Sequence, residues 1–335
     1  MTADNYLLYS VIAAVLPVLL YVGLIYWVDY YEKEPAWLLS AAFLWGAVPA
    51  ALLALLFNTV LSLPFYYLFS ERSAELVVGG AIAPVVEEVT KGLALFLILI
   101  IRRNELDSPL DGVIYGAMVG MGFAMVENIL YYTAYFSESG ASGWNELVFI
   151  RGVIFGLNHA LYTALTGLGI ALARMSRSWR VRLTAPLLGL AAAMTLHAIH
   201  NLSMFNGTTI AFFTGLTFGW GGVAMTVLIM ALALYQERLW MRRYLAEEVD
   251  LGTLTADELK IVSSAVLRGR HRFRLLVTGN VGEFRRTGTR LRNLSELAYR
   301  KRRYAHFNDV SSLTTIADLR QAIAELGRFN GGAEV

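Results

Sequence analysis

Long apolar runs, separated by short polar stretches, fill the first two-thirds of the chain. A helix needs about 20 consecutive apolar residues to cross the hydrocarbon core of a bilayer. Seven runs approach or exceed that length, and each of them predicts one membrane-spanning helix. The runs cover approximately residues 7–28, 36–58, 76–101, 110–135, 147–173, 183–205 and 209–235. The pattern therefore predicts an all-α, polytopic membrane protein.

From Gln236 onward the long apolar runs end, and shorter amphipathic segments follow. Thr255 and Glu258 have the spacing of a capping box, which predicts that a helix begins there. The helices expected in this part cover residues 255–269, 291–304 and 312–326, with a loop at 280–289. We therefore divide the chain into a transmembrane core, residues 1–235, and a soluble helical tail, residues 236–335.

Composition agrees with a membrane protein and excludes several kinds of chemistry. Hydrophobic residues make up 56% of the chain and charged residues 16%, whereas soluble domains are about half apolar and a quarter charged. The absence of cysteine excludes a thiol nucleophile, a disulfide and a thiolate-bound metal. The tail is basic, and its run Arg300–Arg303 is expected to form a solvated face or to contact anionic lipid headgroups. No recognised nucleic-acid-binding motif accompanies this charge, so nucleic acid is not an expected partner.

The distribution of Lys and Arg predicts the orientation of the chain. Basic residues gather after the third, fifth and seventh apolar runs, at Arg102, Arg103, Arg174, Arg177, Arg180, Arg182, Arg238, Arg242 and Arg243. The stretches 137–146 and 206–209 contain neither Lys nor Arg. Because basic loops stay in the cytoplasm, we expect a multi-pass protein of the cell membrane. Its N-terminus is expected outside and its C-terminus in the cytoplasm.

The third apolar run carries three ionisable residues near its middle: Glu87, Glu88 and Lys91. A charged residue at the centre of a membrane helix costs about 2.5–3.5 kcal/mol on insertion. A Glu and a Lys four residues apart can form a purely structural ion pair. An ionisable residue inside the membrane is nevertheless a functional-site hypothesis, which directs attention to possible partners on the other helices.

Three other predicted helices carry polar residues at helical spacing. These are Glu127 and Asn128 on the fourth, Asn158, His159 and Thr163 on the fifth, and His197, His200 and Asn201 on the sixth. Residues three or four positions apart share one face of a helix. A rise of 1.5 Å per residue places all four sets roughly 12–18 Å from the outer ends of their helices. We therefore expect four polar faces to meet in the outer half of the bilayer.

Such a set of side chains is suited to hydrolysis. Carboxylates and imidazoles can bind Zn²⁺ and leave a position for water. The metal lowers the pKa of that water to near 7, and a second carboxylate can take its proton. Lys91 can keep a carboxylate ionised, and Asn201 can donate hydrogen bonds to a developing oxyanion. The same residues can work without a metal if Glu87 and a histidine activate water directly.

Other roles for these residues stay open from the sequence. Asn128 and Thr163 can form interhelical contacts, and His200 can simply line the cavity. The glycines Gly116, Gly120 and Gly122 favour close packing of helices over contact with a substrate. The same cavity can also serve a non-enzymatic transporter or a metal-binding sensor, although no inverted repeat supports transport. Prenyl-protein processing is a third possibility, and it predicts a cavity that opens to the cytoplasm.

Four motifs follow one another on successive predicted helices. They are Glu87-Glu88-x-x-Lys91, Phe123-x-x-x-Glu127-Asn128, His159-x-x-x-Thr163 and His197-x-x-x-Asn201. Together with the segment Asp29–Pro35, these motifs resemble the PrsW family of membrane proteases over about residues 1–240. That family is related to the superfamily of CAAX-processing and bacteriocin-immunity membrane proteases.

The resemblance implies proteolysis of a membrane-anchored, single-span protein, such as an anti-sigma factor, on its extracytoplasmic side. With it, the predicted catalytic residues are Glu87, Glu88, Lys91, Asn128, His200 and Asn201. The predicted metal ligands are Glu127, His159 and His197, with Zn²⁺ as the expected metal. The chain has no His-Glu-x-x-His motif, so no standard zincin helix supports the zinc, and a glutamate-activated water is the alternative.

Overall fold

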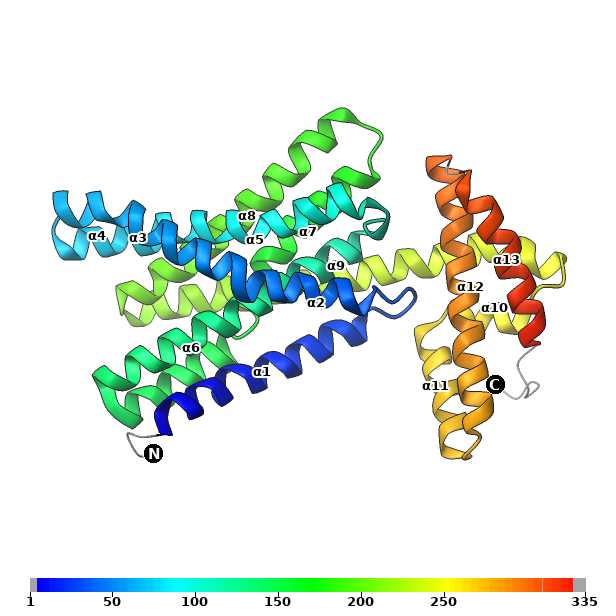
Figure 1. The fold of residues 1–335 in the computed structure, drawn as a ribbon, viewed down its shortest axis with the longest axis horizontal. Coiled ribbons are helices and arrows are strands. Elements are labelled where there is room, and N and C mark those ends of the chain that lie inside the picture. The colour runs from blue at the N-terminus through cyan, green and yellow to red at the C-terminus, as the bar shows by residue number, and fades with distance from the viewer. Residues whose placement is uncertain (1–4, 309, 328–335) are drawn as a thin grey trace. The chain divides into compact units, whose positions relative to one another are not determined.

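The computed structural model describes residues 5–308 and 310–327. Every element in these residues is helical, as Figure 1 shows. The chain separates into two compact units. The membrane unit comprises Met1–Asp29 and Glu34–Met230, and the C-terminal unit comprises Tyr30–Lys33 and Ala231–Val335. Tyr30–Lys33 is thus an early segment of the chain that belongs to the late unit.

The elements of the membrane unit follow one another with short connections. They are α1 (Tyr6–Val28), α2 (Ala36–Trp45), η2 (Gly46–Ala50), α3 (Ala51–Leu68), α4 (Glu71–Val77), η3 (Val78–Ile82), α5 (Ala83–Ile101), η4 (Arg103–Glu105), α6 (Pro109–Phe149), η5 (Ile150–Ile154), α7 (Asn158–Met175), α8 (Trp179–Asn206) and the first part of α9 (Thr209–Asp250). The elements η2, η3 and η5 are π-helical turns, and η4 is a 3₁₀ turn.

Five helical runs in the described residues are long and apolar enough to cross a membrane. These runs are Tyr6–Val28, Ala36–Leu68, Pro109–Met175, Trp179–Asn206 and Thr209–Asp250. The run Pro109–Met175 contains 67 residues, about three times the length that one crossing requires. Helix α5 has 19 residues but carries the three charges of Glu87, Glu88 and Lys91. The structure thus agrees with the prediction of an all-helical membrane protein.

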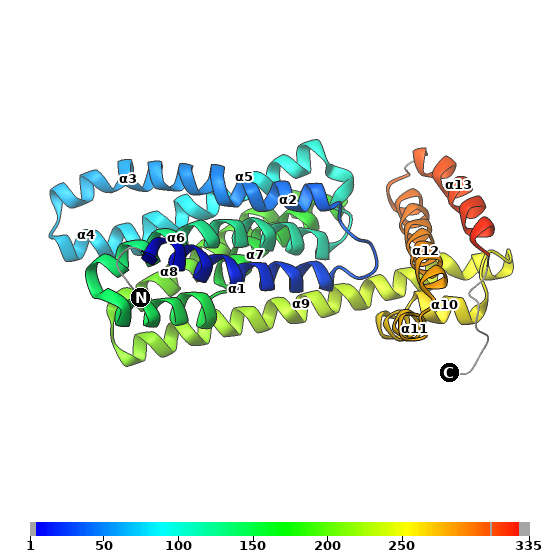
Figure 2. The same ribbon diagram turned by 60° about the horizontal axis from the view of Figure 1, so that its bottom comes forward.

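A row of glycines brings α6 and α7 together at backbone distance. A Cβ atom added at Gly112, Gly116 or Gly120 would lie 2.1–2.4 Å from a backbone carbonyl oxygen of α7. The oxygen opposite Gly120 belongs to His159. Gly122 meets the backbone of α2 in the same way, 2.0 Å from the oxygen of Phe43. The prediction that these glycines serve close packing is confirmed, and Figures 1 and 2 show α6 and α7 side by side.

The polar stretch 137–146, which we expected between two helices, lies inside α6. The helix is interrupted there at Gly140, whose φ of 64° and ψ of −164° are not helical. Glycine adopts a positive φ without steric penalty, since it has no Cβ atom. The chain therefore bends at Gly140 and continues as a helix up to Phe149.

The C-terminal unit consists of the last part of α9 and four further helices, α10 (Ala256–Val262), α11 (Ala265–Val277), α12 (Val281–Phe307) and α13 (Ser311–Leu326). The capping box predicted at Thr255 is present, because its hydroxyl accepts from the backbone N–H of Glu258 at 3.1 Å. The predicted helix 255–269 is wrong, since it is two helices with Ser264 capping the second. The predicted loop 280–289 is also wrong. There Asn280 caps α12, its side chain accepting from the N–H of Glu283.

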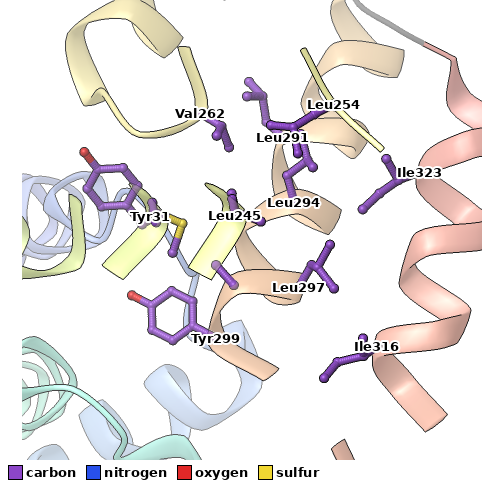
Figure 3. Packing of buried hydrophobic residues seen from close by; sticks show 12 residues of the cluster. Tyr31, Leu245, Leu254, Val262, Leu291, Leu294, Leu297, Tyr299, Ile316 and Ile323 are labelled. Atoms are coloured by element: carbon purple, nitrogen blue, oxygen red, sulfur yellow. The ribbon is translucent and has the colours of Figure 1, made fainter. Parts of the chain in front are cut away.

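The core of the C-terminal unit is built around buried leucines of α9 and α12 (Figure 3). Leu245, Leu294 and Leu297 are fully buried. Tyr31 belongs to the same cluster although it comes from the segment between α1 and α2. Its hydroxyl donates to the carbonyl oxygen of Ser263 and accepts from the N–H of Ala265, both at 3.2 Å. An N-terminal residue thus completes a C-terminal core.

Candidate active site: a buried cluster of carboxylates, histidines and cations

Helix α5 supplies the centre of the site. Glu87, Glu88 and Lys91 are all buried, with exposed fractions of 6%, 0% and 0%. Helical spacing turns the three side chains to one side. The ammonium group of Lys91 donates to Oε1 of Glu88 at 2.5 Å and lies 3.9 Å from Oε2 of Glu87. The pair Glu88–Lys91 is therefore the tight one, and Glu87 is held more loosely.

Helix α8 brings His197 against both carboxylates of α5. Its Nδ1 lies 2.9 Å from Oε1 of Glu88, and its Nε2 lies 3.8 Å from Oε2 of Glu87. The ring of Tyr162, from α7, stacks on the imidazole with centroids 4.9 Å apart. The contact with Glu88 places the proton on Nδ1, so Nε2 presents its lone pair toward Glu87.

Helix α7 contributes His159 and Thr163, one helical turn apart. Nδ1 of His159 lies 3.1 Å from the ammonium group of Lys91. The hydroxyl of Thr163 donates to Oε2 of Glu88 at 3.3 Å. Glu88 therefore interacts with Lys91, Thr163 and His197, so that both of its oxygens are engaged. Such a carboxylate is suited to holding its neighbours in place.

Helix α6 and the turn η5 contribute a second ion pair beside the first. Arg151 donates from Nη2 to Oε2 of Glu127 at 2.5 Å and from Nε to Oδ1 of Asn128 at 2.8 Å. Its guanidinium lies 4.0 Å from the ring centroid of Tyr131. The same Oε2 of Glu127 is 2.8 Å from Nε2 of His159. Both ring nitrogens of His159 are thus in contact with charged groups.

Two buried oxygens of this cluster have no hydrogen-bond partner among the described residues: Oε2 of Glu87 and the hydroxyl of Tyr162. The carboxylate oxygen is the one beside the two imidazoles. The potential ligand atoms of Glu87, His159 and His197 all lie within 4.8 Å of one another. Leaving a buried carboxylate oxygen without a partner is costly. The arrangement therefore calls for a further group between these three residues.

The sequence model described as PrsW family intramembrane metalloprotease matches residues 34–235 of this chain, more than half of its length. The chain belongs to the PrsW family. This confirms the resemblance drawn above from the four motifs. The match begins at Glu34 and takes in the helices that carry the cluster.

Three relatives, each named Protease PrsW, illustrate the similarity. The protein from Clostridioides difficile (strain 630) is 34% identical over 129 residues, which are 38% of this chain and 50% of that protein. The protein from Oceanobacillus iheyensis is 28% identical over 192 residues, 56% of this chain and 80% of that protein. The protein from Geobacillus kaustophilus is 28% identical over 167 residues, 48% of this chain and 65% of that protein. The chain thus spans between half and four-fifths of these relatives' lengths. No solved structure matches the chain.

The donor atoms of the cluster fit the divalent metal that a metalloprotease family implies. Zinc ligands at about 2.1 Å from the metal in a tetrahedron lie roughly 3.4 Å from each other. The 3.8 Å between Oε2 of Glu87 and Nε2 of His197 is close to that separation. Three carboxylates, including Glu127, lie beside the two cations Lys91 and Arg151. A divalent cation would give the unpartnered oxygen of Glu87 a partner.

The candidate group that the geometry brings together differs from the predicted ligand set in one position. It contains His159 and His197, with Glu87 where the sequence suggested Glu127. Oε2 of Glu127 accepts from Arg151 and contacts His159, whereas Oε2 of Glu87 has no hydrogen-bond partner among the described residues. Among the predicted catalytic residues, the structure brings Glu87, Glu88 and Lys91 into the cluster directly.

The other predicted catalytic residues make different contacts. Asn128 reaches the cluster only through Arg151. His200 packs its ring edge against Phe155, with centroids 4.6 Å apart, and its buried Nδ1 has no described hydrogen-bond partner. Asn201 donates from Nδ2 to the carbonyl oxygen of Gly79 at 2.8 Å, which ties α8 to η3. In this arrangement the Asn201 amide is not aimed at the cluster.

Arg151 is the residue that reasoning from the sequence missed. It lies four residues inside the apolar run 147–173, so it was itself an ionisable residue within a predicted membrane helix. The rule that led to Glu87 applies equally to such an arginine. Asking for its partner would have led to Glu127, the nearest carboxylate on the preceding helix.

Proposed function

We propose that this chain is a membrane-embedded endopeptidase with a zinc ion held by Glu87, His159 and His197. The observation that carries the proposal is the unpartnered, buried Oε2 of Glu87 beside the two imidazoles. Membership of a family described as intramembrane metalloproteases supports the same activity. When bound, the metal would act as a Lewis acid and supply an activated water at neutral pH.

The residues around the three ligands have distinct roles in this proposal. Glu88 orients His197 through Nδ1, an arrangement common behind metal-bound histidines. Lys91 neutralises Glu88 and also lies 3.9 Å from Oε2 of Glu87, so it favours the ionised form of both carboxylates. The side chain of Glu127 is 17% exposed, more than those of Glu87 and Glu88. Glu127 is therefore the carboxylate of the cluster that is most open to water or substrate.

The topology that we propose has seven membrane crossings. It counts α1, the run α2–α3, α5, α6, α7, α8 and the first part of α9 as one crossing each. Helix α5 crosses despite its charges because Lys91 and Glu88 are paired and buried. With the N-terminus outside and the C-terminal unit in the cytoplasm, the cluster lies in the outer half of the bilayer. The metal identity and this orientation are parts of the proposal.

The substrate that we propose is a single-span membrane protein cut near the outer leaflet. This class, of which an anti-sigma factor is one example, is carried over from the resemblance to the PrsW family. A site at that depth would receive a peptide bond from a substrate helix or its juxtamembrane segment. The cytoplasm-facing cavity of a prenyl-protein processing enzyme would lie on the opposite side.

The test uses the purified full-length chain in proteoliposomes with a fluorescent single-span reporter. We expect Glu87→Gln and His159→Ala each to abolish cleavage and to remove the bound metal, measured by elemental analysis. Glu138→Gln changes an exposed carboxylate on α6 and should leave both readouts unchanged. Normal cleavage by the two site variants would refute the proposal. Metal bound at this site without cleavage of any single-span reporter would favour a metal-binding sensor instead.

A further inference from the structure

The side chains of the basic run in the tail, Arg300–Arg303, are engaged within their own unit. Arg300 donates to Glu296 at 2.6 Å, and Lys301 donates to Glu247 and Glu248 at 2.7 Å. Arg302 is 95% buried, with its guanidinium 3.5 Å from the ring centroid of Trp240, and Arg303 is buried as well. The residues that the sequence suggests for headgroup contact are therefore occupied within their own unit.

A different surface of the C-terminal unit combines exposed apolar and basic side chains. It is the outward face of α11, formed by Val266, Arg270, Phe273, Arg274, Leu276 and Val277. Residues 266, 270, 273 and 277 recur at the spacing of a single helix face. Phe273 is 66% exposed and Val277 68% exposed. Exposed apolar side chains that gather on one face of a helix mark an interaction surface or a membrane contact.

The opposite face of α11 is anchored in its own unit, which fixes the direction of the exposed face. Arg268 donates from Nε to the oxygen of Val262 at 2.7 Å and from Nη2 to the hydroxyl of Ser295 at 2.5 Å. Its guanidinium also lies 4.9 Å from the ring centroid of Tyr31. Burial lowers the pKa of Arg268 to about 10, so the group is charged at neutral pH. Helix α11 is therefore not free to rotate its apolar side inward.

The charge of this surface is uniformly positive. Between Glu258 and Glu283 the chain contains no Asp or Glu, whereas α11 alone carries four arginines. Burial and the neighbouring Arg274 both lower the pKa of His271. The positive charge on the exposed face at neutral pH consequently comes from Arg270 and Arg274. Arginine beside phenylalanine and leucine is the composition of helices that lie in a membrane interface.

The chain itself keeps α11 close to a bilayer. Tyr31 bonds the backbone at both ends of the α10–α11 connection, and it is only three residues beyond Val28, where the candidate span α1 ends. Three extended residues reach at most about 11 Å. Chain length alone, whatever the arrangement of the two units, therefore holds the start of α11 near the end of a membrane helix.

We propose that the outward face of α11 inserts into the headgroup region of a bilayer rich in anionic lipid. Phe273, Leu276 and Val277 enter the interface, and Arg270 and Arg274 contact lipid phosphates. The apolar side chains favour a lipid bilayer as the partner. The positive charge favours an anionic bilayer over an uncharged one. This inference concerns the C-terminal unit alone, and it does not depend on the proteolytic activity.

The absence of native cysteine allows a direct measurement of depth on the full-length protein. A fluorophore is attached to Val277→Cys, and a matched one to Leu313→Cys, which is 43% exposed on α13. Each protein is reconstituted into vesicles with brominated acyl chains, either pure phosphatidylcholine or equal parts of phosphatidylcholine and phosphatidylglycerol. We expect lipid quenching of the label at 277 in the anionic vesicles and little quenching at 313.

Reversing the charge of one arginine on α11 tests whether that face contacts anionic lipid. An arginine near an anionic surface contributes about 1 kcal/mol, so Arg270→Glu should lower the ratio of inserted to free α11 at least about fivefold. The matched reversal Arg292→Glu, at an exposed position of α12, should leave quenching at 277 unchanged. Absent quenching at 277, or equal quenching at 313, would overturn the proposal. Energy transfer between differently labelled copies without lipid quenching would assign the surface to a second copy, and would also overturn it.

Discussion

Both units of this protein bury carboxylates, and Glu87 of the membrane unit differs from those of the C-terminal unit in its hydrogen bonds. In the C-terminal unit Glu258 is 97% buried, and both of its oxygens are bonded. Oε1 accepts from Arg290 at 2.9 Å, and Oε2 accepts from the N–H of Thr255 at 2.8 Å. Glu248 is fully buried and bonded by Lys301, Arg320 and Thr253. In the membrane unit, Glu87 is also buried, yet one oxygen has no hydrogen-bond partner among the described residues.

The difference distinguishes two kinds of buried carboxylate: one whose hydrogen bonds are all made, and one that keeps an oxygen without a partner. A buried ion pair whose hydrogen bonds are all made holds helices in register and loses heavily when one partner is removed. A buried carboxylate oxygen without a partner lowers the stability of the fold. Such an oxygen is retained where a ligand, a metal or a substrate can bind to it. Four sets of variants test this contrast.

The largest effect is expected for Glu87→Gln, which should abolish cleavage while leaving the fold intact. Because Oε2 of Glu87 has no hydrogen bond to lose, the unfolding free energy of the metal-free protein should change by less than about 1 kcal/mol. Cleavage of the reporter and thermal unfolding in detergent measure the two quantities. A collapse of stability with the loss of activity would show that Glu87 is a structural residue like Glu258.

Glu258→Gln, in contrast, is expected to lower the stability of the C-terminal unit. The change leaves Arg290, only 2% exposed, as an uncompensated buried charge. We expect the C-terminal unit to lose about 3–5 kcal/mol of unfolding free energy, measured by denaturant titration with a probe in α12. Asp257→Asn, which breaks the exposed pair with Lys260, is the matched control and should cost less than about 1 kcal/mol. Equal effects of the two variants would contradict a structural role for the buried pair.

A smaller effect should follow from Glu88→Gln, because Glu88 acts on the proposed metal through His197. Partners behind metal ligands contribute about 10–100-fold to metal affinity, and we expect a loss in that range. Competition with a zinc-binding dye measures the affinity. The loss should be accompanied by some loss of stability, since Lys91 then loses its 2.5 Å partner. An unchanged affinity would remove Glu88 from the site.

The smallest effect is expected for Arg151→Lys. Lysine keeps the positive charge beside Glu127, but it cannot bond Glu127 and Asn128 at once as the guanidinium does. We expect roughly a tenfold loss of cleavage rate, with metal affinity within about threefold of the parent. Arg151→Gln should lose considerably more, because Glu127 is then left without its cation. If Lys and Gln variants behave alike, the charge of Arg151 has no role.

Much of the site could be foreseen because helical periodicity is a strong constraint. The spacing of Glu87, Glu88 and Lys91, with His159 and His197 at a similar distance along their helices, was enough to predict that these side chains meet. The sequence alone does not distinguish Glu87 from Glu127 as the candidate ligand. The distinction rests on the pairing of Arg151 with Glu127, which leaves Oε2 of Glu87 open. The direction of Asn201 depends likewise on its contact with Gly79 across two helices.

The helices of the fold also differ in how far the sequence alone predicts them. Long apolar runs predicted the helices of the membrane unit, since few other structures can bury so many apolar residues. The C-terminal unit was less predictable. Its helix boundaries depend on capping by Ser264 and Asn280, polar residues that are equally common in loops. The contribution of Tyr31 to that unit has no signature in the sequence, because the contact joins residues more than two hundred positions apart.

That contact has a consequence for how the chain is made. Tyr31 is synthesised long before the C-terminal helices that enclose it, and the membrane helices are made in between. The C-terminal unit can reach its final stability only when its helices pack against Tyr31. Removing a large aromatic side chain from a core costs about 3–5 kcal/mol. A C-terminal fragment produced on its own, beginning at Ala231, would carry that deficit, and attaching residues 29–34 through a linker should restore it.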